Sequence, residues 1–514
     1  MVNLTKITTN IYAIGAFASL GGIMFGFDIG SNSGAIGTQQ YQEFFNRPDA
    51  LLQGGINGAL SAGCFVGALI AAYPADRFSR KYTLIAASFL FIIGSILQSA
   101  SNGVAMLCAG RAINGLSVGI TSMVIPLYQS EVAPKEIRGR LVAIQQWSIT
   151  WGIFLAFWIQ TGCGHIQSTA AFRIPWAVQG IPALILVAGM WAFPHSPRWL
   201  ADKGRMDEAR QVLANIHGDG DFNHPRVLLE IEEIEAVIKF DREQASHRYS
   251  DLLQPGIAYR VFLGIFLQIW QQLTGMNIIM FYVVLLFQQA KIGDDQSSTL
   301  IASGVSYVIN VVMTVPAIIF VDKWGRRPTM IIGAFCMSAC LWIVGGLLQT
   351  GTWSIDNNPA NQTYGKWVVD LHNEHTANAV VAFIYLFTAS FACSWGPLGW
   401  IYPAEIYPLR VRAMAVSLST AANWFLNWLL NFAVPMMMES LHYGLYMLFA
   451  GFNFLMMMHV FLAYPETKGF TLEEINFVFE CNPRKAIDRD YIERRMKEHY
   501  GANVDEIKEK ANEA

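Results

Sequence analysis

The chain has 514 residues, of which 53% are hydrophobic and 14% charged, and its formal net charge is -3. Soluble chains carry roughly a quarter charged residues, so this composition excludes a disordered chain, a fibrous repeat and a disulfide-stapled secreted domain. The near-zero net charge gives no electrostatic basis for binding nucleic acid. The composition indicates a polytopic membrane protein that is surrounded by a lipid bilayer.

Twelve stretches are long and apolar enough to cross a bilayer as helices, because about 20 residues span its hydrocarbon core. The first six lie near residues 10–34, 53–75, 82–101, 104–127, 141–161 and 174–193. The second six lie near 259–288, 298–321, 328–350, 378–403, 413–437 and 441–463. The predicted fold class is therefore an all-α membrane protein with twelve transmembrane helices in two pseudo-symmetric six-helix bundles.

Two polar segments divide the chain. We expect an N-terminal bundle at 1–200, a cytosolic linker at 201–255, a C-terminal bundle at 256–464 and a cytosolic tail at 465–514. Apolar residues recur in the linker at the spacing of an amphipathic helix, namely Val227, Ile231, Ile234 and Ile238.

Basic residues gather in alternate loops, after spans 2, 4, 8 and 10, and such loops face the cytosol. With an even number of spans, both termini are then cytosolic. Asn361 begins a glycosylation sequon in a loop that is predicted to be extracellular.

The two halves repeat the same charged residues at the same spacing. The first half has Asp76, Arg80, Glu131 and Arg138, and the second has Asp322, Arg326, Glu405 and Arg412. The repeat indicates a duplicated ancestor whose halves enclose a substrate site near the bilayer midplane. Pairs among these residues would latch the cytosolic side shut; the alternative is that the basic residues only set topology.

Two charged residues lie deep in the predicted spans, Asp28 in span 1 and Arg111 in span 4. A charge at such a depth costs about 2.5–3.5 kcal/mol on insertion scales. The two lie at similar depth, so we expect them to pair. If a conformational change separated them, Asp28 would take up a proton, and a proton gradient would be coupled to the movement of the halves. The alternative is a static ion pair that only fixes helix packing.

Neutral amides occupy four other spans, at Gln145, Gln146, Gln268, Gln271, Gln272, Asn277, Asn310, Asn423 and Asn427. Amides both donate and accept hydrogen bonds, which suits a neutral polyhydroxylated solute, and Trp400 could stack on a sugar face. Single amides often only join helices, but we interpret the set as a solute site. No nucleotide, zinc or nucleophile motif occurs in a suitable context, so no cofactor, metal or enzymatic activity is expected.

Several motifs resemble the sugar porter family of the major facilitator superfamily, and the resemblance runs from about residue 10 to 480. The motifs are Gly110-Arg111, Pro134 to Gly139, Pro194-x-Ser196-Pro197-Arg198, Gln271-Gln272-x-x-Gly275-x-Asn277, Asp322-x-x-Gly325-Arg326-Arg327, Gly396-Pro397-x-x-Trp400 and Pro465-Glu466-Thr467-Lys468-Gly469. The chain is most similar to fungal-type high-affinity monosaccharide transporters, a group that includes proton symporters.

The resemblance implies a role for individual residues. Asp28 and Arg111 match the proton-coupling pair, and the positions that match sugar contacts are Gln146, Gln271, Gln272, Asn277, Asn310, Trp400 and Asn423. The implied function is import of a monosaccharide with a proton across the plasma membrane, the sugar being a hexose such as glucose or a pentose such as xylose. The alternatives are a passive uniporter and a non-transporting sugar sensor; Asp28 favours symport, because facilitative members typically lack this acid.

Three positions depart from the family pattern. His195 replaces the usual Glu after span 6, Ser79 replaces the usual Gly after span 2, and Phe281 precedes Tyr282 where two tyrosines are frequent. The first two lie in the cytosolic latch region of the first half and put that latch in doubt.

Overall fold

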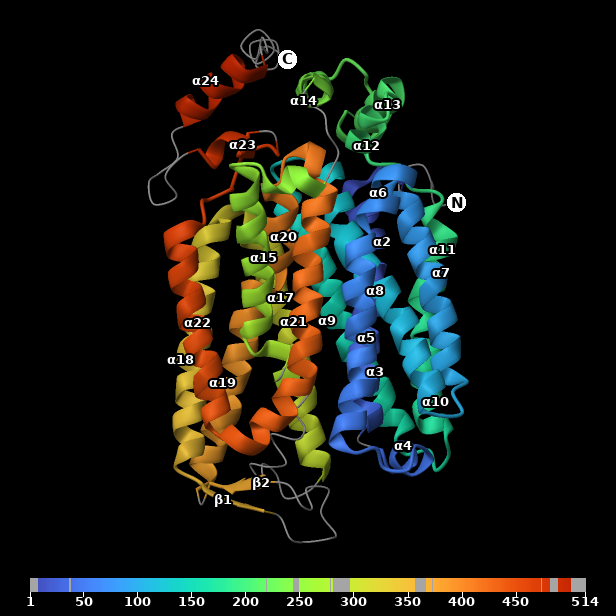
Figure 1. Cartoon of the computed structure of the whole chain (residues 1–514), viewed down its shortest axis with the longest axis vertical. Coiled ribbons are helices and arrows are strands. Elements are labelled where there is room, and N and C mark those ends of the chain that lie inside the picture. The colour runs from blue at the N-terminus through green and yellow to red at the C-terminus, as the bar shows by residue number, and fades with distance from the viewer. Residues whose placement is uncertain are drawn as a thin grey trace.

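Long apolar helices that run side by side make up most of the chain in the computed structural model (Figure 1). It describes residues 8–36, 38–218, 220–243, 249–277, 279–280, 296–355, 367–371, 373–472, 474–480 and 489–500. Within these ranges, ten helical stretches are long and apolar enough to cross a membrane.

The first half begins with a helix that breaks once, and two later spans break in the same way. Its helices are α2 (Ile11–Ala18), α3 (Leu20–Ile36), α4 (Gln39–Phe44), α5 (Ala50–Ile70), α6 (Ala72–Phe78), α7 (Arg80–Ser99), α8 (Val104–Val132), α9 (Arg138–Cys163), α10 (Ala170–Val178) and α11 (Gly180–Met190). Spans 1, 2 and 6 are thus each formed by two consecutive helices.

The linker forms short helices, α12 (Pro197–Asp202), α13 (Met206–His217) and α14 (Pro225–Glu243), followed by the 3-10 turn η1 (Tyr249–Leu253). Val227, Ile231, Ile234 and Ile238 of α14 are buried in one apolar cluster with Trp199 and Leu213. The apolar residues that recur at helical spacing in the linker thus lie on one buried face of α14.

The second half has long helices that follow one another along the chain, and its span 10 is divided into α19 and α20. Its elements are α15 (Ile257–Leu273), α17 (Gln296–Trp324), α18 (Arg326–Gln349), α19 (Glu374–Cys393), α20 (Trp395–Ile406), η2 (Leu409–Val411), α21 (Arg412–Leu441) and α22 (Gly444–Ala463). The tail contributes α23 (Ile475–Val478) and α24 (Arg489–Tyr500).

Spans 7 and 11 are absent from the ten apolar stretches for different reasons. Helix α15 ends at Leu273, shortly before Gly275, whose φ of 88° is unfavourable for most residues. The last part of span 7 from residue 281 on, including Phe281 and Tyr282, lies outside the described residues. Helix α21 is 30 residues long, but its asparagines lower its mean hydropathy.

Small residues allow the helices of the first half to pack closely. A Cβ atom at Gly63 of α5 would lie 2.2 Å from the Ala112 carbonyl oxygen of α8. A Cβ atom at Gly67 would lie equally close to the Leu116 carbonyl oxygen, at 2.2 Å. Glycine at these positions therefore permits backbone contact between the two helices.

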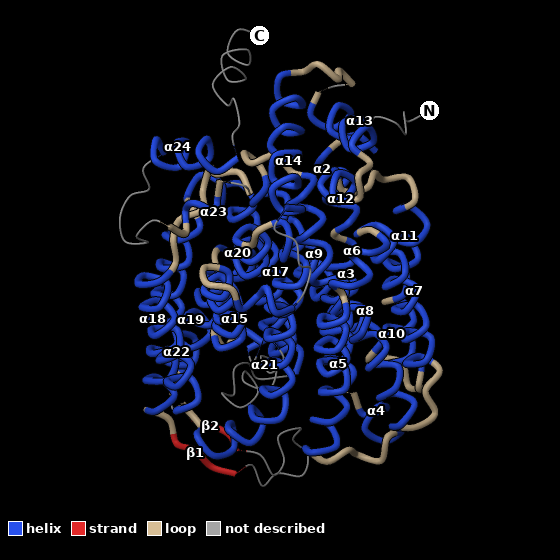
Figure 2. The backbone as a smooth tube through the Cα atoms, turned by 45° about the horizontal axis from the view of Figure 1, so that its top comes forward, coloured by secondary structure: helices blue, strands red, loops and turns tan. Residues whose placement is uncertain are grey.

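The two ends of the molecule differ. Helices α12, α13, α14 and α24 lie at one end together with the start of α2, and α4 and a small sheet lie at the other (Figure 2). The sheet pairs β1 (Thr352–Ile355) with β2 (Trp367–Asp370) in an antiparallel arrangement that the sequence did not predict. Asn361, in the segment between these strands, lies outside the described residues.

Candidate functional site

The structure brings Asp28 of α3 and Arg111 of α8 together inside the first half. Both side chains are buried, and Arg111 Nη1 lies 3.4 Å from Asp28 Oδ1. Arg111 Nε also donates a hydrogen bond to the Ile56 carbonyl oxygen of α5 at 2.9 Å. The guanidinium group thus links three helices.

Two amides that the sequence analysis missed also hold Asp28. Asn114 Nδ2 donates to Asp28 Oδ2 at 3.2 Å, and Gln98 Nε2 lies 3.4 Å from the same oxygen. Asn114 follows Arg111 by three residues and so shares its helix face, which was a usable signal. The only sequence signal for Gln98 was that it is a polar residue near the end of the apolar span 3.

Most of the predicted amides of the second half form one hydrogen-bonded cluster between α15 and α21. Gln272 Nε2 donates to Asn423 Oδ1 at 2.8 Å, and Asn423 Nδ2 donates to the side-chain oxygens of Gln268 and Gln271 at 2.7 and 2.8 Å. Asn277 and Asn427 both donate to Gln272 Oε1, at 2.5 and 3.2 Å. The cluster presents several donors and acceptors within a few ångströms.

Trp400 joins this region to the first half. Its Nε1 atom, on α20, donates to Gln146 Oε1 of α9 at 3.0 Å. Asn310 of α17 is also buried, but it shares no hydrogen bond with the cluster in the described part of the chain. The structure therefore assembles the predicted sugar-contact residues except Asn310.

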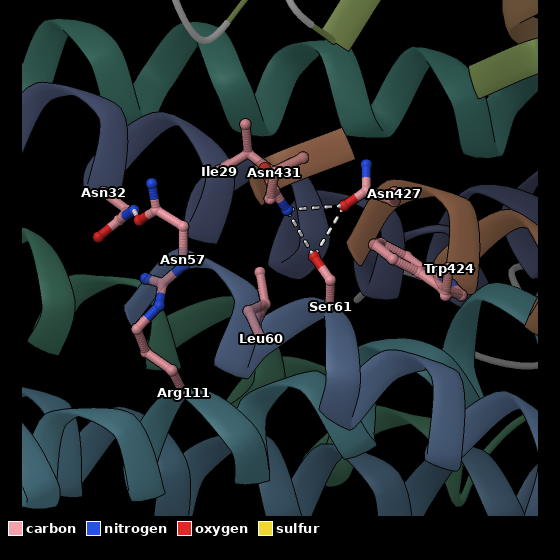
Figure 3. Close-up of a pocket in the computed structure, with 9 residues that line it drawn as sticks. All are labelled: Ile29, Asn32, Asn57, Leu60, Ser61, Arg111, Trp424, Asn427 and Asn431. Atoms are coloured by element: carbon pink, nitrogen blue, oxygen red, sulfur yellow. Dashed lines mark hydrogen bonds between the residues drawn. The ribbon is translucent and has the colours of Figure 1, made fainter. Parts of the chain in front are cut away.

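A pocket lies between the halves, beside the buried ion pair. It is lined by Ile29, Asn32, Asn57, Leu60, Ser61, Arg111, Trp424, Asn427 and Asn431 (Figure 3). Ser61 Oγ donates to Asn427 Oδ1 at 2.7 Å and accepts from Asn431 Nδ2 at 3.0 Å. The pocket thus shares Arg111 with the ion pair and Asn427 with the amide cluster. The sequence analysis did not single out Asn32, Asn57, Ser61 or Asn431.

Charged residues at the end of the first half that carries the linker form a buried network. Arg80 lies 3.0 Å from Asp76 and 2.9 Å from Glu131, measured between side-chain nitrogens and carboxylate oxygens. Ser196 Oγ donates to the second oxygen of Glu131 at 2.5 Å. Glu131 and Arg80 are both buried.

The second half repeats this network at the predicted matching positions. Arg326 Nη2 lies 2.9 Å from Asp322 Oδ1 and 2.7 Å from Glu405 Oε1. Thr467 Oγ1 donates to Glu405 Oε2 at 3.0 Å, in the place that Ser196 takes in the first half. The duplication therefore extends from the sequence motifs to the hydrogen bonds.

The other two arginines of the predicted latch make backbone contacts. Arg412 Nε donates to the Tyr407 carbonyl oxygen at 3.1 Å, within the second half. Arg138 Nη1 donates to the Phe470 carbonyl oxygen at 3.4 Å, and this contact joins the start of α9 to the tail.

Asp322 connects the two halves directly. Its Oδ1 accepts from the Gly139 amide at 3.1 Å and its Oδ2 accepts from the Arg140 amide at 2.9 Å. These amides belong to the first turn of α9, where a negative charge is favourable. The end of the molecule that carries the linker is therefore closed by an anionic helix cap that crosses between the halves.

We expect Asp322→Asn to weaken this closed state, because an amide carries no charge toward the α9 terminus. The helix-terminus contribution is about 0.3–2 kcal/mol, so the open fraction should rise by up to about thirtyfold. Spin-label distances across this end of the molecule would measure it. Asp76→Asn is the matched control, because its contact with Arg80 lies within one half; equal effects of both variants would contradict the assignment.

The two departures from the family pattern in this region contact each other. Ser79 Oγ lies 2.7 Å from His195 Nδ1, and it accepts from the Lys81 amide at 3.2 Å. Burial, and then the charges of Lys81 and Arg205, lower the pKa of His195 to about 4. The imidazole is therefore neutral at pH 7, and it shares one hydrogen bond with the Ser79 hydroxyl whose donor is set by the imidazole tautomer.

In the second half a glycine and a carboxylate occupy the matching positions. Gly325 has a φ of 92° and Ser79 a φ of 102°, a region that favours glycine. Glu466 accepts from the Arg326 and Arg327 amides at 2.9 and 3.0 Å. A Cβ atom at Gly325 would lie 2.7 Å from Glu466 Oε2. The first half thus replaces a carboxylate cap by a hydroxyl cap that the imidazole supports.

We therefore expect Ser79 and His195 to be energetically coupled. His195→Glu alone should destabilise the protein, because its carboxylate would meet the Ser79 side chain. Adding Ser79→Gly removes that contact and relieves backbone strain of about 1–3 kcal/mol, so the double variant should be more stable than His195→Glu alone. Thermal unfolding of the unmodified protein, the two single variants and the double variant in detergent would give this double-mutant cycle. Additive effects of the two substitutions would disprove the coupling.

The fold, the inter-half pocket and the repeated networks are typical of transporters of the major facilitator type. Residues 14–479 match the profile of the family described as sugar (and other) transporter. The chain belongs to this family of multi-pass membrane sugar transporters.

Curated relatives from fungi cover nearly the whole chain. It is 47% identical to a glucose transporter of Aspergillus flavus, over 92% of this chain and 90% of the relative. It is 41% identical to a high-affinity glucose transporter of Kluyveromyces lactis, over 92% and 86%. A high glucose sensor of Saccharomyces cerevisiae is 32% identical, over 94% of this chain and 62% of the sensor.

Solved structures of a bacterial sugar transporter are similar in fold. The proton:xylose symporter XylE bound to 6-bromo-6-deoxy-D-glucose superposes with a TM-score of 0.78 at 28% identity, over 91% of this chain and 99% of that one. The inward-open form of XylE from E. coli gives a TM-score of 0.65 at 27% identity, over 90% and 99%. The structure thus superposes better on the sugar-bound form than on the inward-open form.

Proposed function

We propose that this protein imports a monosaccharide together with a proton by alternating access. The sugar is a hexose such as glucose or a pentose such as xylose, and the protein acts at the plasma membrane with both termini in the cytosol. The moving bodies are the bundles at 1–200 and 256–464, joined by the linker. No bond in the sugar is made or broken, so the protein is not an enzyme and needs no cofactor.

One observation carries this proposal. Arg111 contacts Asp28 on one side and lines the inter-half pocket on the other. A movement of the halves that reshapes the pocket would also move the guanidinium group relative to the carboxylate. An isolated carboxylate in a dry interior takes up a proton, because burial disfavours the charged form.

The proposed sugar site combines the amide cluster with Trp400. Gln146, Gln271, Gln272, Asn277 and Asn423 bind the sugar hydroxyls, and Trp400 covers one face of the ring. Asn310 is the weakest member of this set, because it stands apart from the cluster. In the closed state these amides satisfy one another, so an entering sugar would exchange amide–amide hydrogen bonds for amide–hydroxyl bonds of similar strength.

The repeated charged networks are the proposed cytosolic gate. Arg80 and Arg326 hold the helix ends of their own halves, and Asp322 bridges the halves. The basic residues of this end would face the cytosol, so opening the gate would release sugar and proton inward. A passive uniporter would use the same gate without a coupled proton.

Purified protein in proteoliposomes tests the proposal. With an inward proton gradient, labelled glucose or xylose should accumulate, and sugar addition should drive proton entry that a pH-sensitive dye records. Collapse of the gradient with an ionophore should stop accumulation but leave downhill flux. Sugar entry without proton entry would establish a uniporter, and the absence of any sugar flux would favour a sensor.

A further inference from the structure

The buried carboxylate of Asp28 is held by two amides that belong neither to the predicted site nor to the family motifs quoted above. Asn114 and Gln98 both direct their nitrogens to Asp28 Oδ2, at 3.2 and 3.4 Å. All three side chains are buried. Arg111 lies on the other side of the carboxylate, 3.4 Å from Oδ1, so Asp28 is approached by different groups at its two oxygens.

The backbone of α7 and α8 is shaped to admit these amides. A Cβ atom at Gly94 would lie 2.1 Å from Asn114 Oδ1, and a Cβ atom at Gly110 would lie 2.9 Å from Gln98 Cγ. Any larger residue at either glycine would displace the amide beside it. The two glycines therefore create the space in which Asn114 and Gln98 face Asp28.

Each amide contacts the carboxylate with only one of its two ends. Asn114 Oδ1 and Gln98 Oε1 are buried and have no hydrogen-bond partner among the described residues. An ionised carboxylate only accepts hydrogen bonds, whereas a protonated one also donates. The amide oxygens are the acceptors that a protonated Asp28 would require.

We propose that Asn114 and Gln98 are positioning residues that hold Asp28 in both of its protonation states. They donate to the carboxylate in the state described here. When Oδ2 takes up a proton from the extracellular side, one or both amides rotate about the terminal torsion, and an amide oxygen accepts the new O–H. Release of the proton to the cytosol reverses the rotation. This inference rests on the proposed proton coupling and adds the groups that keep the protonated acid buried and satisfied.

Other ionisable groups near Asp28 cannot supply this acceptor. Arg111 of α8 is a donor only. Cys64 of α5, whose buried thiol interacts electrostatically with Asp28, is only a weak acceptor. From α9 the nearest surface is the backbone at Ile149 and Ile153, which packs against Gly26 and Gly30 of α3.

The test compares three apolar replacements of buried amides with Asp28→Asn. Asn114→Leu and Gln98→Met remove the two positioning amides at nearly constant volume. Gln160→Met is the matched control, because Gln160 is a buried amide of the same half that donates to the Ala171 carbonyl oxygen instead. Each variant is assayed in proteoliposomes for proton-driven accumulation and for sugar exchange at equal concentrations without a gradient.

We expect Asn114→Leu and Gln98→Met each to reduce proton-driven uptake about tenfold, as the loss of one buried hydrogen bond predicts. Sugar exchange should stay within about twofold of the unmodified protein, and Gln160→Met should change both rates equally. Equal loss of exchange and uphill uptake in the two test variants would overturn the proposal, because it would indicate a purely structural role.

Infrared difference spectra between low and high pH give a second readout. The carbonyl band of protonated Asp28, identified by its loss in Asp28→Asn, should move toward the frequency of a free acid in Asn114→Leu or Gln98→Met. An unchanged band in both would overturn the inference and leave proton coupling standing. Uphill uptake by Asp28→Asn would instead remove the proposed function on which the inference rests.

Discussion

Asp28→Asn should abolish accumulation of sugar against its gradient while sparing sugar exchange. An amide cannot carry the proton, but it keeps the size of the side chain and can still accept from Arg111. A proton that crosses 100 mV supplies about 2.3 kcal/mol, enough for an about fiftyfold sugar gradient. We therefore expect the accumulation ratio in energised vesicles to fall from tens to one.

Asp49→Asn is the matched control for this experiment. Asp49 caps the start of α5 by accepting from the Leu52 amide at 2.7 Å, and asparagine is an equally good cap. The control should therefore accumulate sugar normally. If Asp28→Asn still concentrated sugar, the proton would enter through another group and the pair with Arg111 would be only structural.

Glu405→Gln should cause a clear loss of stability. Glu405 is buried and accepts from Arg326 Nε and Nη2 at 3.2 and 2.7 Å, and from Thr467 at 3.0 Å. Leaving a buried charge without any partner typically costs about 3–5 kcal/mol, and because Arg326 keeps its contact with Asp322, we expect a loss at or below the lower end of this range. The melting temperature of the detergent-solubilised protein would report this loss.

The exposed pair of Arg205 and Glu208 provides the contrast. Their side chains are 46% and 50% exposed, and such pairs contribute little because water screens them. Glu208→Gln should leave the melting temperature unchanged. A double replacement, Arg326→Met with Glu405→Leu, should recover part of the stability lost in Glu405→Gln, because it removes both buried charges. Equal melting temperatures for Glu405→Gln and Glu208→Gln would contradict this account.

The sequence predicted the helices and the duplication well, because both leave local signals. Bilayer thickness fixes the length of an apolar run, and the matched spacing of Asp76 and Asp322 identified the repeat. The break at Gly275 and the β1–β2 pair were not predicted, because neither depends on apolar length. The amphipathic helix α14 was predicted, because its pattern is contained in its own residues.

The partners of the site residues were harder to predict. Depth along the helices suggested that Asp28 and Arg111 meet, but depth gives no rotation about the helix axis, so Gln98 was missed. For the gate, the sequence left Arg80 and Arg138 as alternatives for Glu131, and the structure gives the ion pair to Arg80. The hydrogen bond between Ser61 and Asn427 joins residues 366 positions apart, a separation at which spacing carries no information.

The contact between Ser79 and His195 constrains how the two copies of the duplicated half can diverge. A change at either position alone leaves the start of α7 strained, crowded or without its cap. A substitution at one position should therefore favour a compensating substitution at the other. Lineages that carry serine after span 2 should therefore tend to carry a neutral hydrogen-bonding residue after span 6, and lineages with glycine should keep the acid. Covariation between these columns in an alignment of relatives would record that history.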